Sequence, residues 1–124
     1  MNHLFGNKIV GFYVRGRRQK LIDEQIDELF LFASINRIPE NNTRLFLDPL
    51  PSDQGRPSLY HLIANPSVDF MVITRYRILD IKYDVYLHLI NVLESLNITV
   101  IDLESDTQKI KRLTGDDMAH RLNT

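Results

Sequence analysis

The residues best suited to chemistry in this sequence are arginines that stand in polar stretches between apolar segments. Five of them are candidates for contact with an anion: Arg15, Arg17, Arg18, Arg56 and Arg77. A guanidinium is permanently charged and presents a planar fork of N–H donors, which matches the oxygens of a phosphate. The arginines that begin at Arg15 also precede a helical pattern, and a helix N-terminus favours an anion. The pattern predicts a phosphate or anion site, with a solvated basic loop as the alternative.

Two of these positions have further alternatives. Arg56 could point into the same pocket, or it could cap a structural element. For Arg75 and Arg77 we expect an exposed loop or a salt bridge to Asp80 or Asp84 in preference to phosphate binding.

Other chemistries find little support in the sequence. The chain has no cysteine, which excludes disulfides, thiolate metal sites and a cysteine nucleophile, and fits a cytoplasmic protein. The histidines lack the spacing of metal ligands: His3, His61, His88 and His120. No glycine-rich phosphate loop is present. We therefore expect no metal and no cofactor.

Length and composition limit the architecture. A chain of 124 residues with 44% hydrophobic residues predicts one folded domain, residues 1–124. The formal net charge of −1 excludes a globally basic nucleic-acid-coating protein but not a local basic patch. Apolar runs such as residues 70–74 are far shorter than the roughly 20 residues of a membrane helix. Residues 1–8 do not resemble a secretory signal.

Apolar periodicity indicates which elements must position the arginines. Strand patterns occupy residues 8–14, 44–48, 69–74 and 98–103, and helical patterns occupy residues 22–33, 57–65 and 86–96, with a weaker one at 107–113. This alternation predicts an α/β domain, a three-layer sandwich with a small, mostly parallel sheet flanked by helices. Ligands gather at the carboxyl ends of such strands. Here those ends lead into residues 15–20, 49–56 and 75–82.

Four segments carry a family resemblance. GFYVRGRRQKLIDEQIDEL, GRPSLYHLI, DFMVITRYRILD and ITVIDL resemble, in this order, the catalytic domain of serine recombinases, the resolvase and invertase family. The resemblance covers about residues 8–103 and implies a resolvase-like fold, with residues 104–124 as a short helical or flexible tail. In that family a serine hydroxyl attacks a DNA phosphodiester among arginine side chains.

The family's nucleophile has no counterpart here. Tyr13, Val14 and Arg15 match the segment that holds its first catalytic arginine, and the nucleophile position is then Arg17 or, with a shift of one residue, Gly16. Other positions do match the family pattern: Gln25 in the following helix, Asp48 and Ser52 before a turn, and Arg56 with Pro57.

The family's second arginine motif is also broken. With the acidic position set on Tyr76, Arg77 keeps one arginine, but Asp80 replaces the second. In the gap-free register, Arg77, Ile78 and Ile81 occupy the three positions. Loss of both the nucleophile and the second cationic cluster implies loss of catalysis, so we expect no catalytic residues.

These observations favour a catalytically inactive resolvase-like domain that acts as a protein-interaction or regulatory module, of phage or mobile-element origin. The alternative is a DNA-recombination accessory protein that binds the phosphate backbone weakly through its arginines. A third reading is an active DNA strand-exchange enzyme with Tyr76 or Thr74 as nucleophile. We expect a homodimer or a partner protein, with no role for a membrane.

Overall fold

A computed structural model describes residues 5–49 and 55–105. In this part of the chain four strands alternate with three α-helices and two short 3-10 turns. In chain order they are β1 (Ile9–Gly16), α1 (Gln19–Ile35), η1 (Glu40–Asn42), β2 (Thr43–Pro49), α2 (Pro57–Ala64), β3 (Val68–Ile73), η2 (Tyr76–Leu79), α3 (Tyr83–Ser95) and β4 (Thr99–Asp102).

The four strands form one sheet in the order β2-β1-β3-β4, and every neighbouring pair is parallel. The inner strand β1 is apolar from Ile9 to Val14, as expected for a strand with both faces covered, and Arg15 stands near its carboxyl end. It pairs with β2 from Val10 to Gly16 but with β3 only as far as Phe12. The last residues of β1 therefore have no strand partner on the β3 side.

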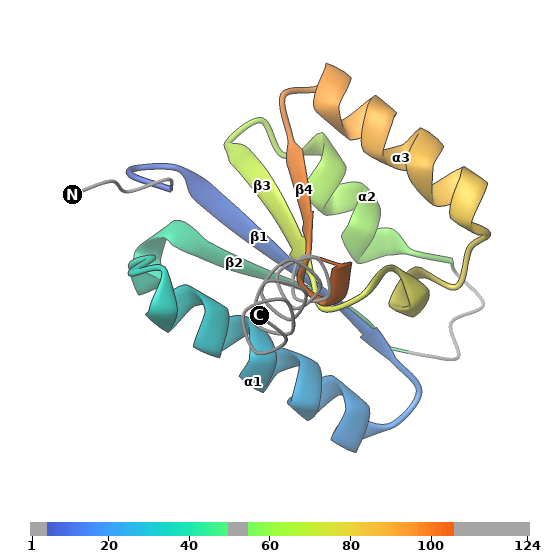
Figure 1. Ribbon diagram of the computed structural model, residues 1–124, viewed down its shortest axis with the longest axis horizontal. Helices are drawn as coiled ribbons and strands as arrows, with labels where there is room; N and C mark the ends of the chain where they lie inside the picture. Colours follow the sequence, from blue (N-terminus) through green and yellow to red (C-terminus); the bar gives the residue numbers. More distant parts are fainter. Residues whose placement is uncertain (1–4, 50–54, 106–124) are drawn as a thin grey trace, which may run out of the picture.

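Helices cover both faces of the sheet, as Figure 1 shows. On one face α1 buries Ile22, Leu29 and Ala33 against the sheet. On the other face α2 and α3 bury Leu59, Leu62, Tyr86 and Leu93. The predicted three-layer α/β architecture with a parallel sheet is confirmed.

The predicted elements agree with the observed ones to within a few residues at their ends. Tyr86 is buried and Tyr83 is exposed, as expected for a helix with one face in the core. Asn97 adopts a left-handed conformation, with φ of 65°, after the end of α3. The turn η2 was not anticipated. The predicted helix at 107–113 lies outside the described residues, as does the tail beyond residue 105.

Among the described residues, no helix is long and apolar enough to cross a membrane. The same residues contain no group of three or more His, Asp or Glu side chains arranged to hold a metal ion.

Candidate functional site

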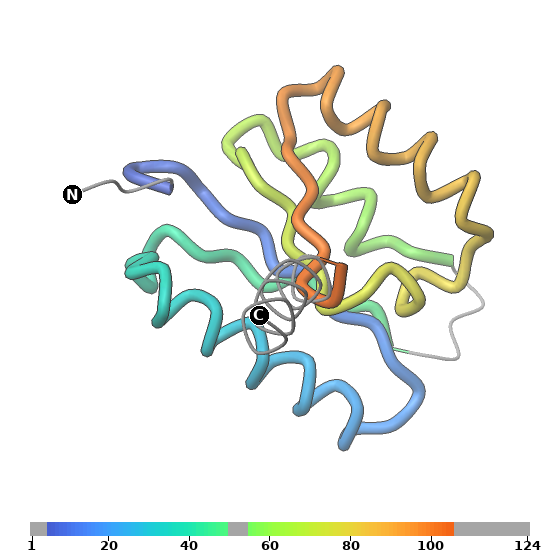
Figure 2. The backbone as a smooth tube through the Cα atoms, viewed as in Figure 1, coloured from blue at the N-terminus to red at the C-terminus, as the bar shows by residue number. Residues whose placement is uncertain are grey.

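The carboxyl ends of β3 and β4 run into segments that lie side by side (Figure 2). The backbone N–H of Glu104 donates to the carbonyl of Thr74 at 2.9 Å. The N–H of Tyr76 donates to the Asp102 carboxylate at 3.1 Å. These bonds fix the segment that carries Arg75 and Arg77 beside the end of β4.

A cleft of about 340 Å³ opens where the end of β1 and the first turns of α1 meet this segment. It is lined by Arg15, Gly16, Arg17, Leu21, Glu24, Gln25, Arg75, Arg77, Ile78 and Asp80. The wall of the cleft thus contains four guanidinium groups and two carboxylates. Among the lining residues, positively charged side chains therefore outnumber negatively charged ones.

Arg15 is the most deeply placed of these arginines, with only 8% of its surface exposed. Its Nη1 donates to the carbonyl of Ile78 at 3.2 Å, and its Nε has no hydrogen-bond partner. Within residues 5–49 and 55–105, Arg15 takes part in no ion pair. A buried charge is normally paired. Among the described residues, Arg15 is therefore a cation without a carboxylate partner at the wall of a cleft.

Gln25 holds the backbone at Arg15. Its side-chain Oε1 accepts from the Arg15 N–H, and its Nε2 donates to the Arg15 carbonyl. Because β3 no longer pairs with β1 at this point, the amide supplies bonds that a neighbouring strand would otherwise make. The glutamine that matches the family pattern is thus buried and positions an arginine of the cleft.

The other predicted arginines separate into two groups. Arg17 is exposed and lines the cleft. Arg18, the residue before α1, is exposed and does not line it. Arg56 lies outside the cleft as well, because its Nη2 donates to the carbonyl of Leu79 at 2.6 Å. The structure thus shows Arg56 bonded to backbone carbonyls at the end of η2.

Arg75 and Arg77 are ion-paired, but the partners expected from sequence were wrong. Arg75 pairs with Glu28 at 3.3 Å and with Glu104 at 3.2 Å. Arg77 also pairs with Glu104, and this bond raises the pKa of the Arg77 guanidinium. Both glutamates come from distant parts of the chain, so the pairing depends on the fold.

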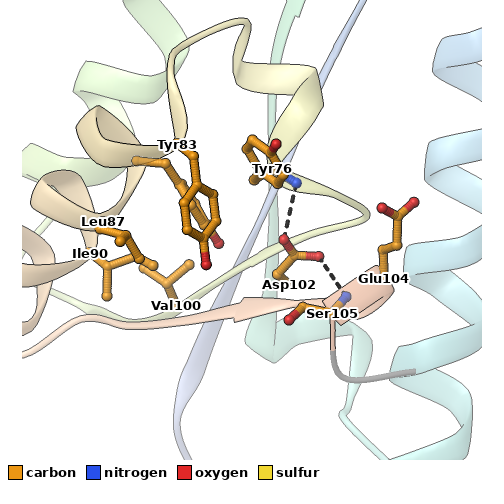
Figure 3. Close-up of a pocket in the computed structure, with 9 residues that line it drawn as sticks. Tyr76, Tyr83, Leu87, Ile90, Val100, Asp102, Glu104 and Ser105 are labelled. Carbon is orange, nitrogen blue, oxygen red and sulfur yellow. Dashed lines mark hydrogen bonds between the residues drawn. The ribbon is translucent and has the colours of Figure 1, made fainter. Parts of the chain in front are cut away.

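A second cavity, of about 350 Å³, lies beside the cleft and contains three tyrosines (Figure 3). The rings of Tyr76 and Tyr86 stack with centroids 5.3 Å apart, and Tyr83 meets Tyr76 edge-on. Asp102 accepts from the N–H groups of Tyr76 and Ser105 and so fixes the end of β4. Burial raises the pKa of the Asp102 carboxyl. The tyrosine rings thus pack against one another at the wall of this cavity.

The two alternative nucleophiles lie outside the cleft. Tyr76 belongs to the tyrosine cavity, and Thr74 is fully buried and lines neither cavity. Among the described residues that line the cleft, none carries a hydroxyl or a thiol. Ser52, the serine matched before the turn, lies outside the described residues.

Asp48 joins three elements near the cleft. Its carboxylate accepts from the Tyr13 hydroxyl at 2.7 Å and from the backbone N–H groups of Ser58 and Leu59 at the start of α2. Burial opposes ionisation of Asp48, but these hydrogen bonds lower its pKa overall. Burial, then the bond to Asp48, raise the pKa of Tyr13. The aspartate matched by family resemblance therefore positions the start of α2.

Sequence reasoning did not find Glu104, the main carboxylate partner of Arg75 and Arg77. One signal could have found it. Glu104 follows the last predicted strand, and the carboxyl ends of parallel strands share one edge of a sheet.

The parallel sheet with helices on both faces has the resolvase-like α/β fold of serine recombinase catalytic domains. The N-terminal catalytic domain of TP901-1 integrase superposes with a TM-score of 0.61 at 20% identity, over 94% of this chain and 99% of that chain. A resolvase family site-specific recombinase from Streptococcus pneumoniae gives 0.63 at 15% identity, over 94% and 89%.

The C-terminal catalytic domain of IS1535 TnpA, an IS607-like serine recombinase, gives a TM-score of 0.61 at 16% identity, over 76% of this chain and 70% of that chain. No family model matches the sequence, and no curated protein matches it. These likenesses establish the fold of the chain.

Proposed function

We propose that this chain is a catalytically inactive resolvase-like domain that binds DNA phosphates through the arginine-lined cleft, as a recombination accessory or regulatory module. The buried guanidinium of Arg15, which has no carboxylate partner in the described part of the chain, carries the proposal. A phosphate oxygen would supply the missing counter-ion and an acceptor for Nε.

The chemistry of the cleft supports binding without strand cleavage. Covalent catalysis needs a nucleophile that can donate an electron pair to phosphorus. Of the two residues at the expected nucleophile position, Arg17 is permanently cationic and Gly16 has no side chain. Arg15 and Arg17 can stabilise the charge on a phosphate, but they cannot replace an attacking hydroxyl. The domain would therefore hold the DNA backbone and leave it intact.

DNA binding tests the proposal directly. A fluorescent DNA duplex of arbitrary sequence should bind with an affinity that falls steeply as salt rises. Arg15→Ala should weaken binding about tenfold or more, because it removes the central guanidinium. Arg44→Ala is the matched control. It removes the same charge from the beginning of β2, at the amino end of the strands, whereas the cleft lies at their carboxyl end. Equal affinities for the two variants would refute the proposed site.

Catalytic inactivity needs its own measurement. Incubation with supercoiled and linear DNA should give no protein–DNA adduct that survives denaturation. An adduct that disappears in Tyr76→Phe or in Thr74→Val would instead identify the chain as a strand-exchange enzyme with an unusual nucleophile.

A second candidate function, protein interaction, is supported by apolar side chains on the outer side of α1. Phe30, Leu31 and Ile35 are 51%, 61% and 70% exposed. Light scattering should then show a homodimer that Leu31→Glu disrupts. If the protein is a monomer at all concentrations, this surface would have to bind a different protein. A pull-down that compares wild type with Leu31→Glu would test that.

A further inference from the structure

Glu104 is held in a fixed position beside Arg75 and Arg77. Its backbone N–H donates to the Thr74 carbonyl at 2.9 Å, immediately before Arg75 in the chain. Asp102 accepts from the Ser105 N–H at 3.1 Å, the bond that a helix N-cap residue makes. The backbone around Glu104, in the helical turn at residues 103–105, is therefore held by hydrogen bonds on both sides. In Figure 3 Glu104 lies on the far side of Asp102 from the tyrosines.

Both carboxylate oxygens of Glu104 pair with arginines that line the cleft. Oε2 pairs with Nε of Arg75 at 3.2 Å, and Oε1 pairs with Nη2 of Arg77. Arg75 and Arg77 both line the cleft, whereas Glu104 does not. A single negative charge thus engages two guanidiniums from outside the space that an anion would enter.

We propose that Glu104 is an internal competitor for the anion, which holds Arg75 and Arg77 until a phosphate displaces it. This inference rests on the proposed function of the cleft. Arg15 and Arg17 are free of ion pairs in the described part of the chain and bind first. Arg75 and Arg77 exchange their carboxylate for phosphate only when the ligand offers enough charge. Glu104 therefore sets a threshold for binding and selects ligands of high charge density.

The exposure of these ion pairs makes the exchange reversible. The side chains of Arg75, Arg77 and Glu104 are 38%, 64% and 27% exposed. Ion pairs that contact solvent contribute little net stability, because water and salt screen them. An entering phosphate can thus replace Glu104 without unfolding the turn. The position of the Glu104 backbone does not depend on its charge, so the neutral side chain can be tested.

Glu104→Gln tests the competition. The amide keeps the size of the side chain and removes its charge. Arg77 then becomes available to the ligand, and Arg75 keeps only its exposed pair with Glu28. Affinity for the fluorescent DNA duplex should rise roughly three- to tenfold. The slope of log affinity against log salt concentration should become more negative by about 1 to 2, since up to two more arginines contact phosphate. Glu94→Gln is the control, because it makes the same charge change at an exposed position of α3.

The background variant Arg75→Ala with Arg77→Ala separates competition from a general charge effect. In that background Glu104→Gln should give no gain beyond that of Glu94→Gln. Equal gains for Glu104→Gln and Glu94→Gln in the otherwise unmodified protein would overturn the inference.

The failures of the two proposals are distinguishable. If Arg15→Ala weakens binding but Glu104→Gln behaves as the control, the anion cleft stands and the competition is excluded. If Arg15→Ala has no effect, the proposed function fails first. Absence of DNA binding by every variant, including Glu104→Gln, would exclude both.

Discussion

The side-chain amide of Gln25 bonds both backbone polar groups of Arg15, accepting from its N–H at 3.2 Å and donating to its carbonyl at 2.8 Å. Both residues are buried. A residue in α1 thereby completes the hydrogen bonding of β1 at the point where β1 loses its neighbour β3. The amide thereby fixes the backbone from which the Arg15 side chain extends, and the side chain itself donates to the Ile78 carbonyl.

Gln25→Leu should destabilise the fold by about 2–4 kcal/mol, because it leaves two buried backbone groups without partners. DNA affinity should fall in parallel if the cleft binds phosphate. Urea unfolding followed by circular dichroism would measure the stability. Gln19→Leu on the exposed side of the same helix should change it by less than about 0.5 kcal/mol. A similar loss in both variants would show that Gln25 does not have this role.

Tyr13→Phe should cost about 1–2 kcal/mol, because Asp48 loses a hydroxyl donor. The pKa of Tyr13 is raised by burial and by Asp48. The stability that protonated Tyr13 contributes is therefore present below the pKa of an unfolded tyrosine, about 10, and is lost as pH rises above it. Wild type should lose stability above about pH 10, and Tyr13→Phe should lose less. The exposed Tyr60 serves as control, and Tyr60→Phe should follow wild type.

Asp48→Asn should destabilise the protein at neutral pH by about 1–3 kcal/mol, since a charged acceptor of three hydrogen bonds becomes neutral. The pKa of Asp48 is lowered in the folded state. The stability that it contributes is thus present above an aspartate's ordinary pKa, about 4, and is lost as pH falls below it. Chemical unfolding between pH 2 and pH 7 should show a smaller acid-induced loss in Asp48→Asn than in Asp27→Asn, an exposed control.

Gly11→Ala should destabilise the sheet by about 1–3 kcal/mol. A Cβ at this position of β1 would lie 3.0 Å from Cδ1 of Leu62 and 3.3 Å from Cε2 of Phe46. Leu62 is fully buried in the core and has little room to move. Leu62→Ala should cost less in the Gly11→Ala background than in wild type, which a double-mutant cycle would measure. Strict additivity would contradict the close approach of α2 to β1.

The elements of this fold are encoded locally. The apolar runs of the strands and the helical spacing of Ile22, Leu29 and Ala33 are visible in the sequence, and their alternation requires parallel strands. The turn η2 escaped prediction because its form depends on distant groups. Arg56 donates to the carbonyl of Leu79, the last residue of η2, and to that of Asp80, which follows it in a left-handed conformation with φ of 54°.

The sequence by itself determined the order of the elements and which segments between them carry arginines. Only the tertiary structure decided which arginines share the cleft. It placed Arg15, Arg17, Arg75 and Arg77 there and directed Arg56 to backbone carbonyls. The physical reason is that the partner of a charged side chain is set by where separate chain segments meet. Glu104 reaches Arg75 and Arg77 across the carboxyl edge of the sheet, and no local pattern contains that contact.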